Sequence, residues 1–237
     1  MDLDHHRRGV VCACDVDDLD AVSRLVERID GVEGLVGYKL GSLLTLRQGL
    51  AGVVGAFRKV TRKPLLYDHQ KAGLDIPSMG REFVTVCREA GVDALILFPL
   101  GGPSTVDAFV RETMQAGLRP IVGGALPLSD FLIRGGGYVS PSALARITDR
   151  AYALGARDFI VPATDVPTIQ RQARFLTVRG GGRLFLPGIG PLGGEITQAF
   201  AATRGIASYA IVGRAIYAAP DPQEAARRLA GEALAVA

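Results

Sequence analysis

Short apolar runs alternate eight times with longer segments of helical periodicity along this chain of 237 residues. Strands that are apolar on both faces, each followed by a helix, predict a parallel sheet covered by helices. Eight such units favour a closed α/β barrel, the (β/α)8 or TIM barrel, over the open doubly wound sheet that is the structural alternative. The expected strands are residues 9–15, 34–40, 64–68, 92–98, 118–123, 158–162, 184–187 and 208–213.

Helix starts fall between these strands and carry favourable capping chemistry. Ser42, Ser140 and Asp165 are expected as N-caps, because their side-chain oxygens can accept from free backbone N–H groups. The eight helices are expected to begin near Asp18, Ser42, Pro77, Pro103, Ser140, Asp165, Gly194 and Pro220.

No linker interrupts this alternation, so the sequence predicts one domain over residues 1–237, with residues 1–8 as a flexible tail that includes His5 and His6. Hydrophobic residues make up 48% of the chain, enough for a large core. The N-terminal segment is charged and short, which argues against a signal peptide or a membrane span. We therefore expect a cytoplasmic protein with no membrane partner.

Charge and cysteine content narrow the classes of partner. The 27 Lys and Arg against 24 Asp and Glu give a net charge of only +3, and the basic residues are scattered. A nucleic-acid partner is therefore not indicated, and a single phosphate group is a better match. Cys12, Cys14 and Cys87 are expected as buried thiols in a reducing compartment. With His69 the only histidine in the body of the chain, we expect no metal site.

Ionisable residues of alternating sign stand where the first three apolar runs end. Asp15 ends the first, Lys39 the second and Asp68 the third, with Lys71 and Asp75 shortly after. Any one of these could be polar simply because a strand end meets solvent. In a barrel, however, the carboxyl ends of all strands meet at one face, where active sites lie. Five such groups on one face therefore predict a catalytic cluster.

The last two apolar runs are followed by segments suited to bind an anion. Pro187, Gly188, Gly193 and Gly194 follow or end the seventh run, and Gly213 and Arg214 follow the eighth. Glycine lets backbone N–H groups approach phosphate oxygens closely, and arginine adds a bidentate cation. Tight turns and a local salt bridge are the simpler explanation, but the position in the barrel favours a phosphate site.

Taken together, these segments resemble the orotidine 5′-phosphate decarboxylase family over nearly the whole chain. The most specific combination is Asp75-Ile76-Pro77 after the strand-three lysine with Val212-Gly213-Arg214-Ala215-Ile216-Tyr217 after the eighth strand. The other segments that carry the resemblance are the strand ends at Asp15 and Tyr38-Lys39, residues 68–77, Pro187-Gly188-Ile189 with Gly193-Gly194, and residues 211–217.

The resemblance implies a cofactor-independent and metal-independent decarboxylase that converts orotidine 5′-phosphate (OMP) to UMP and CO2 in pyrimidine biosynthesis. It implies a homodimer in which Asp75 and Ile76 reach the neighbouring subunit's site. Lys71 would protonate the carbanion at pyrimidine carbon six, beside Asp68 and Lys39. Ribose would bind Asp15, and phosphate would bind Gly213 and Arg214.

Three departures from the family pattern leave alternatives open. Asp68, Lys71 and Asp75 are spaced more widely than the usual Asp-x-Lys-x-x-Asp. Pro127 stands near the usual base-binding Ser or Thr, with Ser129 as the nearest substitute, and Leu192 replaces a usual glutamine. The alternatives are a Mg²⁺-dependent 3-keto-gulonate-phosphate decarboxylase or hexulose-phosphate synthase, and a non-catalytic nucleotide or phosphate sensor. Glu33 lies before the second strand, which disfavours the metal-dependent enzymes.

Overall fold

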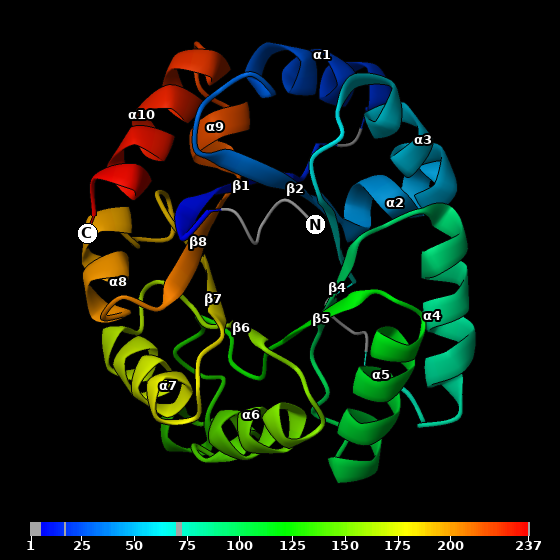
Figure 1. Ribbon diagram of the computed structural model, residues 1–237, viewed down its shortest axis with the longest axis vertical. Helices are drawn as coiled ribbons and strands as arrows, with labels where there is room; N and C mark the ends of the chain where they lie inside the picture. Colours follow the sequence, from blue (N-terminus) through cyan, green and yellow to red (C-terminus); the bar gives the residue numbers. More distant parts are fainter. Residues whose placement is uncertain (1–5, 17, 70–72, 237) are drawn as a thin grey trace.

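Eight parallel strands close into a barrel in sequence order, from β1 to β8. The computed structural model describes residues 6–16, 18–69 and 73–236. Figure 1 looks along the barrel, with the strands in the inner ring and the helices around them. The predicted (β/α)8 fold is therefore confirmed. The strands are β1 (Arg8–Cys14), β2 (Leu35–Gly41), β3 (Leu65–Asp68), β4 (Ala94–Leu97), β5 (Arg119–Val122), β6 (Asp158–Ile160), β7 (Arg183–Pro187) and β8 (Ala207–Val212).

The helices of the outer ring follow the strands in turn. They are α1 (Leu19–Ile29), α2 (Ser42–Gln48), α3 (Leu50–Val60), α4 (Met79–Ala90), α5 (Pro103–Gln115), α6 (Ala143–Ala153), α7 (Val166–Val178), α8 (Ile196–Ala202), α9 (Arg214–Tyr217) and α10 (Pro222–Ala235), with a 3-10 turn, η2 (Ile133–Gly135), before α6. Asp18 caps α1 and Asp165 caps α7 through their side chains, as expected of acidic residues at these positions.

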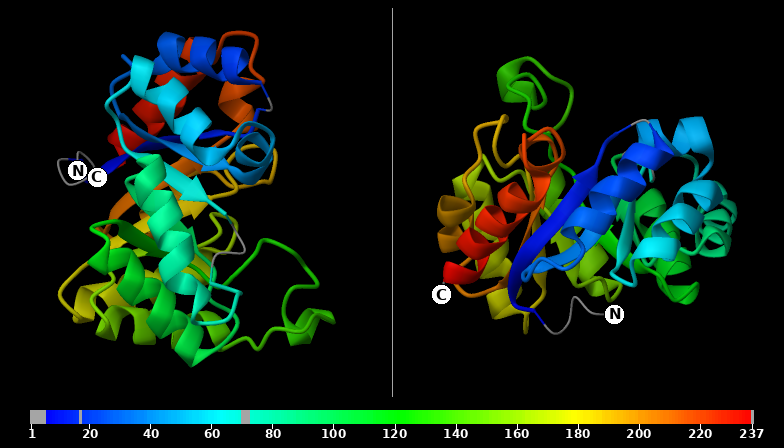
Figure 2. Two further views of the ribbon diagram at one scale, coloured as in Figure 1. Left: turned by 90° about the vertical axis from the view of Figure 1, so that its right-hand side faces the viewer. Right: turned by 90° about the horizontal axis from the view of Figure 1, so that it is seen from above.

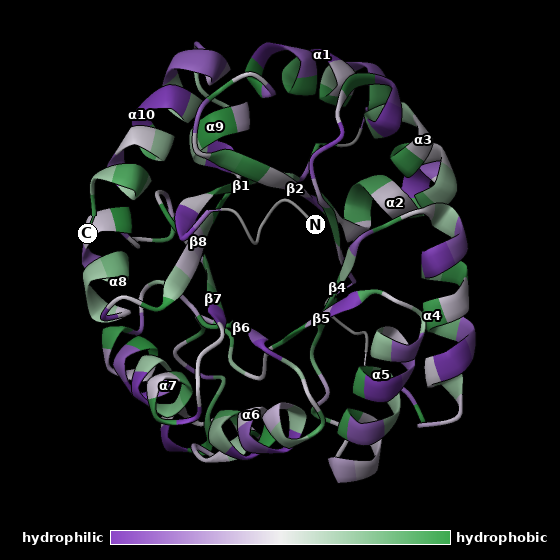
Figure 3. Ribbon diagram, in the orientation of Figure 1, coloured by the Kyte–Doolittle hydropathy of each residue, from purple (hydrophilic) through white to green (hydrophobic). Residues whose placement is uncertain are grey.

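Two hydrophobic cores follow from the alternation of side chains along each strand. In β1, Val11 and Ala13 belong to the core inside the barrel, whereas Val10, Cys12 and Cys14 belong to the core between strands and helices. Along the helices, hydrophobic residues recur among hydrophilic ones (Figure 3), as expected when one side of each helix covers the sheet. Residues two positions beyond an inward-facing residue therefore also face the interior of the barrel.

The three cysteines are buried and free, as predicted. Burial raises the pKa of the Cys87 thiol to about 12. The pKa of Cys14 is also raised, first by its hydrogen bond toward Cys12 and then by burial. Both thiols therefore remain protonated at neutral pH and act as core residues.

Three sequence expectations need correction at the ends of elements. The predicted tail, residues 1–8, includes Arg8, which belongs to β1 and donates to the hydroxyl of Thr203. Gly41, not Ser42, caps α2, and Ser142, not Ser140, caps α6. The segment after β2 forms two helices instead of one, because Gly49 adopts a positive φ of 72° between α2 and α3.

A long connection between β5 and α6 projects from the barrel. Figure 2 shows this segment, which includes η2, extending away from the ring of helices. Leu128, Ile133 and Tyr138 along it are exposed. A hollow of about 480 Å³ lies against Tyr138, between Val106 of α5 and Ile147 of α6. None of the predicted site residues that the structure describes lines this hollow.

A buried charge cluster closes the opposite end of the barrel. Asp158, Arg119 and Arg183 are the first residues of β6, β5 and β7, and they meet at the N-terminal ends of these strands. The Asp158 carboxylate is buried, contacts Nε of Arg119 at 3.5 Å and is hydrogen-bonded by Arg183. Burying a carboxylate is costly unless it is paired, so the two arginines offset the cost of burying Asp158 where the three strands begin.

We expect Asp158→Ala to lower the free energy of unfolding by about 3–5 kcal/mol, because it removes the carboxylate that both arginines contact in a buried setting. Chemical denaturation followed by circular dichroism measures this loss. The control is Asp149→Ala, which breaks an exposed ion pair with Arg179 and should cost about 1 kcal/mol or less. Equal losses in the two variants would contradict the structural role given to Asp158.

Within the described ranges, no helix combines the length and the apolar character needed to cross a membrane.

Candidate active site

The carboxyl ends of β1, β2, β3, β7 and β8 surround a cavity of about 280 Å³ at one face of the barrel. Eight residues singled out in the sequence line it, although they are spread over about 200 positions of the chain. They are Asp15, Lys39, Asp68, Pro187, Gly188, Leu192, Gly213 and Arg214. The structure thus brings the predicted charged cluster and the predicted anion-binding segments to one site.

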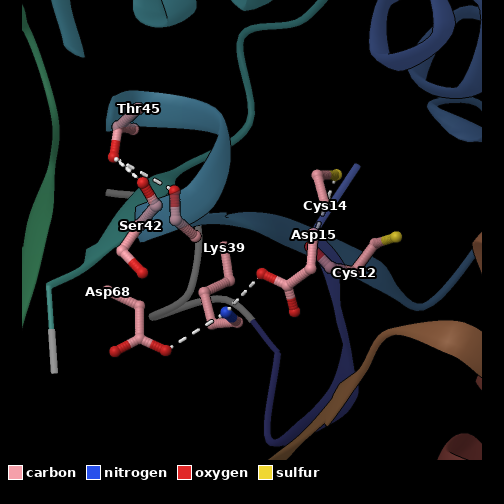
Figure 4. Close-up of polar contacts among 8 residues, drawn as sticks. Cys12, Cys14, Asp15, Lys39, Ser42, Thr45 and Asp68 are labelled. Atoms are coloured by element: carbon pink, nitrogen blue, oxygen red, sulfur yellow. Dashed lines mark hydrogen bonds and ion pairs between the residues drawn. The ribbon is translucent and has the colours of Figure 1, made fainter. Parts of the chain in front are cut away.

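Lys39 lies between two carboxylates at the centre of the charged cluster. Its Nζ is 3.0 Å from Oδ1 of Asp15 and 3.1 Å from Oδ2 of Asp68, as Figure 4 shows. The three residues come from neighbouring strand ends, because β1 pairs with β2 and β2 with β3 in parallel register. Lys39 and Asp68 are almost buried, with 10% and 12% of the side chain exposed, whereas Asp15 is 42% exposed.

Electrostatics keep Lys39 charged despite its burial. Burial by itself would lower the pKa of Lys39, but the carboxylates of Asp68 and Asp15 outweigh it, so the pKa lies above its usual value. At neutral pH the cluster therefore holds a fixed ammonium group between two carboxylates. Such preorganised charge suits a site in which charge develops on a substrate.

One carboxylate oxygen of this cluster is a hydrogen-bond acceptor without a donor among the described residues. Oδ1 of Asp68 is buried and has no hydrogen-bond partner in the part of the chain that the structure describes. A buried acceptor without a donor costs about 1–3 kcal/mol. The environment of Asp68 therefore favours the binding of a cation or a hydrogen-bond donor at Oδ1.

The loop after β7 folds back on itself through its backbone. Gly193 N donates to Gly190 O at 2.7 Å, Gly190 N donates to Gly194 O at 2.9 Å, and Gly194 N donates to Gly188 O at 3.0 Å. A Cβ on Gly194 would come within 2.7 Å of the Gly188 oxygen, so this close approach requires glycine. Gly193 and Gly194 shape the loop without lining the cavity, whereas Gly188 and Leu192 line it.

Arg214 supplies a further cation of the cavity lining, after β8, the strand that pairs with β1. It is the first residue of α9, directly after Gly213, and its side chain is exposed. The alternative explanation, a local salt bridge, is not supported, because Arg214 has no ion pair with any described residue. A charged guanidinium at the rim of a cavity, beside a glycine-rich loop, is well suited to a phosphate group.

Comparison with known proteins identifies the family of this chain. The model of the orotidine 5′-phosphate decarboxylase / HUMPS family matches residues 9–229. The chain belongs to this family. Its relatives include the orotidine 5′-phosphate decarboxylase of Methanosarcina barkeri, 32% identical over 231 residues that cover 94% of this chain and 93% of the relative. The orotidine 5′-phosphate decarboxylase of Thermococcus kodakarensis is 29% identical and covers 96% of this chain and 97% of its own.

Solved structures of the family share the fold. Orotidine 5′-monophosphate decarboxylase from Methanocaldococcus jannaschii, complexed with the inhibitor BMP, superposes with a TM-score of 0.81 at 21% identity and covers 96% of this chain and 99% of that chain. The enzyme from Pyrococcus horikoshii has a TM-score of 0.76 at 25% identity, with 96% and 100% coverage. The single-domain barrel is therefore the architecture of the family.

Of three predicted residues after β3, one lies outside the described residues and two do not line the cavity. Lys71 lies outside the described residues, between His69 and Gly73. Asp75 and Ile76 are exposed and absent from the cavity lining, and Oδ1 of Asp75 accepts from the backbone N–H of Ile76 at 2.7 Å. The ring of His69 packs 5.7 Å from that of Phe83, and its Nδ1 lies 2.9 Å from the Tyr67 hydroxyl.

The two altered base-recognition positions differ in their placement. Ser129 is exposed on the projecting β5–α6 connection and does not line the cavity, and Pro127 is also absent from the lining. Leu192 lines the cavity and is about half exposed. The cavity therefore has an apolar side chain at the position where the resemblance predicts a glutamine.

Sequence reasoning missed two residues that contribute to the site. Tyr217 lines the cavity, and its pKa is raised by burial and by the nearby Asp15 carboxylate. Gly41, the last residue of β2, approaches Asp15 more closely than any side chain would allow. Tyr217 ends the motif after the eighth strand, and Gly41 follows Lys39 by two residues on the same strand face, so both had a signal in the sequence.

The structure also locates groups relevant to metal binding and to nucleotide loops. Among residues 6–16, 18–69 and 73–236, no three His, Cys, Asp or Glu side chains are grouped as metal ligands. Glu33 is exposed and precedes the N-terminal end of β2, away from Lys39.

Gly188, Gly190 and Gly193 have Gly-x-Gly-x-x-Gly spacing. Here these glycines belong to a loop of a closed barrel rather than to the first turn of a doubly wound fold.

Proposed function

We propose that this protein is an orotidine 5′-phosphate decarboxylase that converts OMP to UMP and CO2 in pyrimidine biosynthesis, with no metal and no organic cofactor. The observation that carries the proposal is one cavity lined both by the Asp15–Lys39–Asp68 cluster and by Gly188, Gly213 and Arg214. Curated relatives about 30% identical over most of the chain carry the name of this enzyme.

The chemistry assigns each group a role. The C6–carboxylate bond breaks heterolytically, CO2 leaves, and the electron pair remains on carbon six. The Lys71 ammonium then gives its proton to carbon six, which forms UMP and leaves a neutral amine that regains a proton from water. A vinyl carbanion has little resonance stabilisation, so a fixed cation near carbon six must stabilise it as it forms.

Asp68 and Lys39 prepare this step. The buried Asp68 carboxylate repels the substrate carboxylate, and its unpartnered Oδ1 offers Lys71 an acceptor. Lys39 holds Asp68 and Asp15 in place, and Asp15, the most exposed of the three, binds a ribose hydroxyl. Repulsion that disappears when CO2 leaves favours the transition state over bound substrate.

The phosphate binds at the ends of β7 and β8, to Arg214 and the backbone at Gly213, Pro187 and Gly188, with Gly193 and Gly194 shaping the loop. Binding energy from this non-reacting group can be used to hold the pyrimidine ring against the charged cluster. Ser129, on the β5–α6 connection, contacts the base when this connection lies nearer to the cavity.

A homodimer completes the proposal. Asp75 and Ile76 lie outside the cavity of their own chain and are exposed, together with the apolar side chains of Leu74 and Met79. Exposed apolar groups of this kind are typical of protein interfaces. In the dimer, Asp75 and Ile76 reach the neighbouring subunit's site. A cytoplasmic location agrees with the three free cysteines.

The proposal is tested by following OMP absorbance with purified protein in EDTA, with and without later addition of Mg²⁺. We expect full decarboxylation in EDTA and no gain on adding Mg²⁺. Turnover of 3-keto-gulonate 6-phosphate that requires Mg²⁺, without turnover of OMP, would favour the metal-dependent relative. UMP binding without turnover of either substrate would indicate a sensor.

A further inference from the structure

Gly41 occupies a central position between the three charged residues. It ends β2 and is the direct ladder partner of Asp68 on β3. On the other side of β2, Cys14 of β1 pairs with Leu40. The residues that follow these two, Asp15 and Gly41, therefore lie side by side. Lys39 precedes Gly41 by two residues and therefore lies on the same face of β2. Gly41 thus stands above the Lys39 ammonium, between the strands that supply its two carboxylates.

A carboxylate oxygen fills the space that a side chain at position 41 would need. A Cβ built on Gly41 would lie 2.0 Å from Oδ1 of Asp15, 3.2 Å from Cγ of Asp15 and 3.7 Å from Nζ of Lys39. The Asp15 Oδ1 atom is the same one that accepts from Lys39 at 3.0 Å. A methyl group at position 41 therefore requires Oδ1 of Asp15 to leave the place from which it contacts Lys39.

The backbone at Gly41 does not itself require glycine. Its φ of −81° and ψ of 161° are extended values that any residue adopts. Asp15 is 42% exposed, so its carboxylate can swing toward solvent when a methyl group displaces it. An alanine at position 41 should therefore cost little stability and act mainly on the Asp15 carboxylate.

We propose that Gly41 is a positioning residue for the charged cluster, because the missing side chain keeps open the space in which Asp15 reaches Lys39. Its effect on turnover rests on the proposed function, whereas its effect on the Asp15–Lys39 contact does not. Gly41 acts through Asp15 and makes no contact with substrate of its own.

The first test compares Gly41→Ala with Gly55→Ala. Gly55 lies in α3, and a Cβ there meets nothing within 4 Å, so it controls for a glycine-to-alanine change without a clash. We expect Gly41→Ala to lower kcat/KM for OMP roughly 10- to 100-fold, because small misplacements in a preorganised site carry penalties of this size. Gly55→Ala should retain the kcat/KM of the parent. Both variants should keep the thermal unfolding midpoint of the parent within a few degrees.

A double-mutant cycle then separates positioning from a general structural effect. In an Asp15→Ala background the methyl group at position 41 has room, so Gly41→Ala should have no further effect on kcat/KM. A loss that is the same with and without Asp15 would overturn the proposal. The same cycle is measured on the dissociation constant of UMP by calorimetry, which needs no turnover.

A crystal structure of the Gly41→Ala variant gives a readout independent of both turnover and binding. We expect the Asp15 carboxylate to have left Lys39, while the Lys39–Asp68 contact remains. An intact Asp15–Lys39 contact beside Ala at position 41 would overturn the proposal, whatever the protein decarboxylates. A displaced Asp15 in a protein that does not turn over OMP would support the positioning role and reject the proposed function alone.

Discussion

Replacing Lys71 with alanine is expected to lower kcat for OMP decarboxylation by roughly 10⁴-fold, because one change removes both the proton donor and the cation that stabilises the carbanion. UMP should still bind, since the residues proposed to bind its phosphate, Arg214 and Gly213, are unchanged in this variant. Single-turnover kinetics measure the chemical step, and calorimetry with UMP measures binding.

The matched control for this variant is Lys59→Ala on α3, an exposed lysine outside the cavity. It should leave both kcat and the affinity for UMP at the values of the parent. Retained turnover in Lys71→Ala would remove Lys71 from the mechanism. Loss of UMP binding together with turnover would mean that Lys71 holds the ligand rather than donating the proton.

Arg214→Ala is expected to lower kcat/KM for OMP roughly 10²-fold, mainly through a higher KM, because a charge-assisted contact to phosphate is lost. The diagnostic comparison is between UMP and uridine as competitive inhibitors. The inhibition constant of UMP should rise by a similar factor, whereas that of uridine, which has no phosphate, should not change.

Arg227→Ala on α10 controls for the loss of one exposed positive charge, since it lies outside the cavity. It should alter neither inhibition constant. If Arg214→Ala weakened UMP and uridine equally, Arg214 would contact the nucleoside, and the phosphate would bind elsewhere. An unchanged KM for OMP would have the same meaning.

The sequence predicted the barrel well because the same strand and helix signals are repeated eight times along the chain. Each apolar run and each helical segment is a separate signal of the same fold, and errors of one or two residues at Ser42 or Ser140 leave the alternation intact. The rule that barrel sites lie at the carboxyl ends of strands then selected Asp15, Lys39 and Asp68, and all three line the cavity.

Other features of the site depend on distances that a sequence does not contain. The close approach of Gly41 to Asp15 arises from the register between β1 and β2 and from the conformation of the Asp15 side chain. Ser129 was expected near the base, but it is exposed on the β5–α6 connection and does not line the cavity, and the course of a long loop is weakly specified by its sequence. The roles of Asp75 and Ile76 need a second chain and remain predictions.

The spacing of Asp68, Lys71 and Asp75 makes the position of Lys71 the central question. A crystal structure of the protein with UMP measures it directly. We expect the phosphate at Arg214, the ribose at Asp15, and Nζ of Lys71 within about 3.5 Å of pyrimidine carbon six, the separation that proton transfer in a preorganised site requires. UMP bound in this way with Lys71 directed out of the cavity, or with its pyrimidine ring outside the cavity that Lys39 and Asp68 line, would contradict the proposed mechanism.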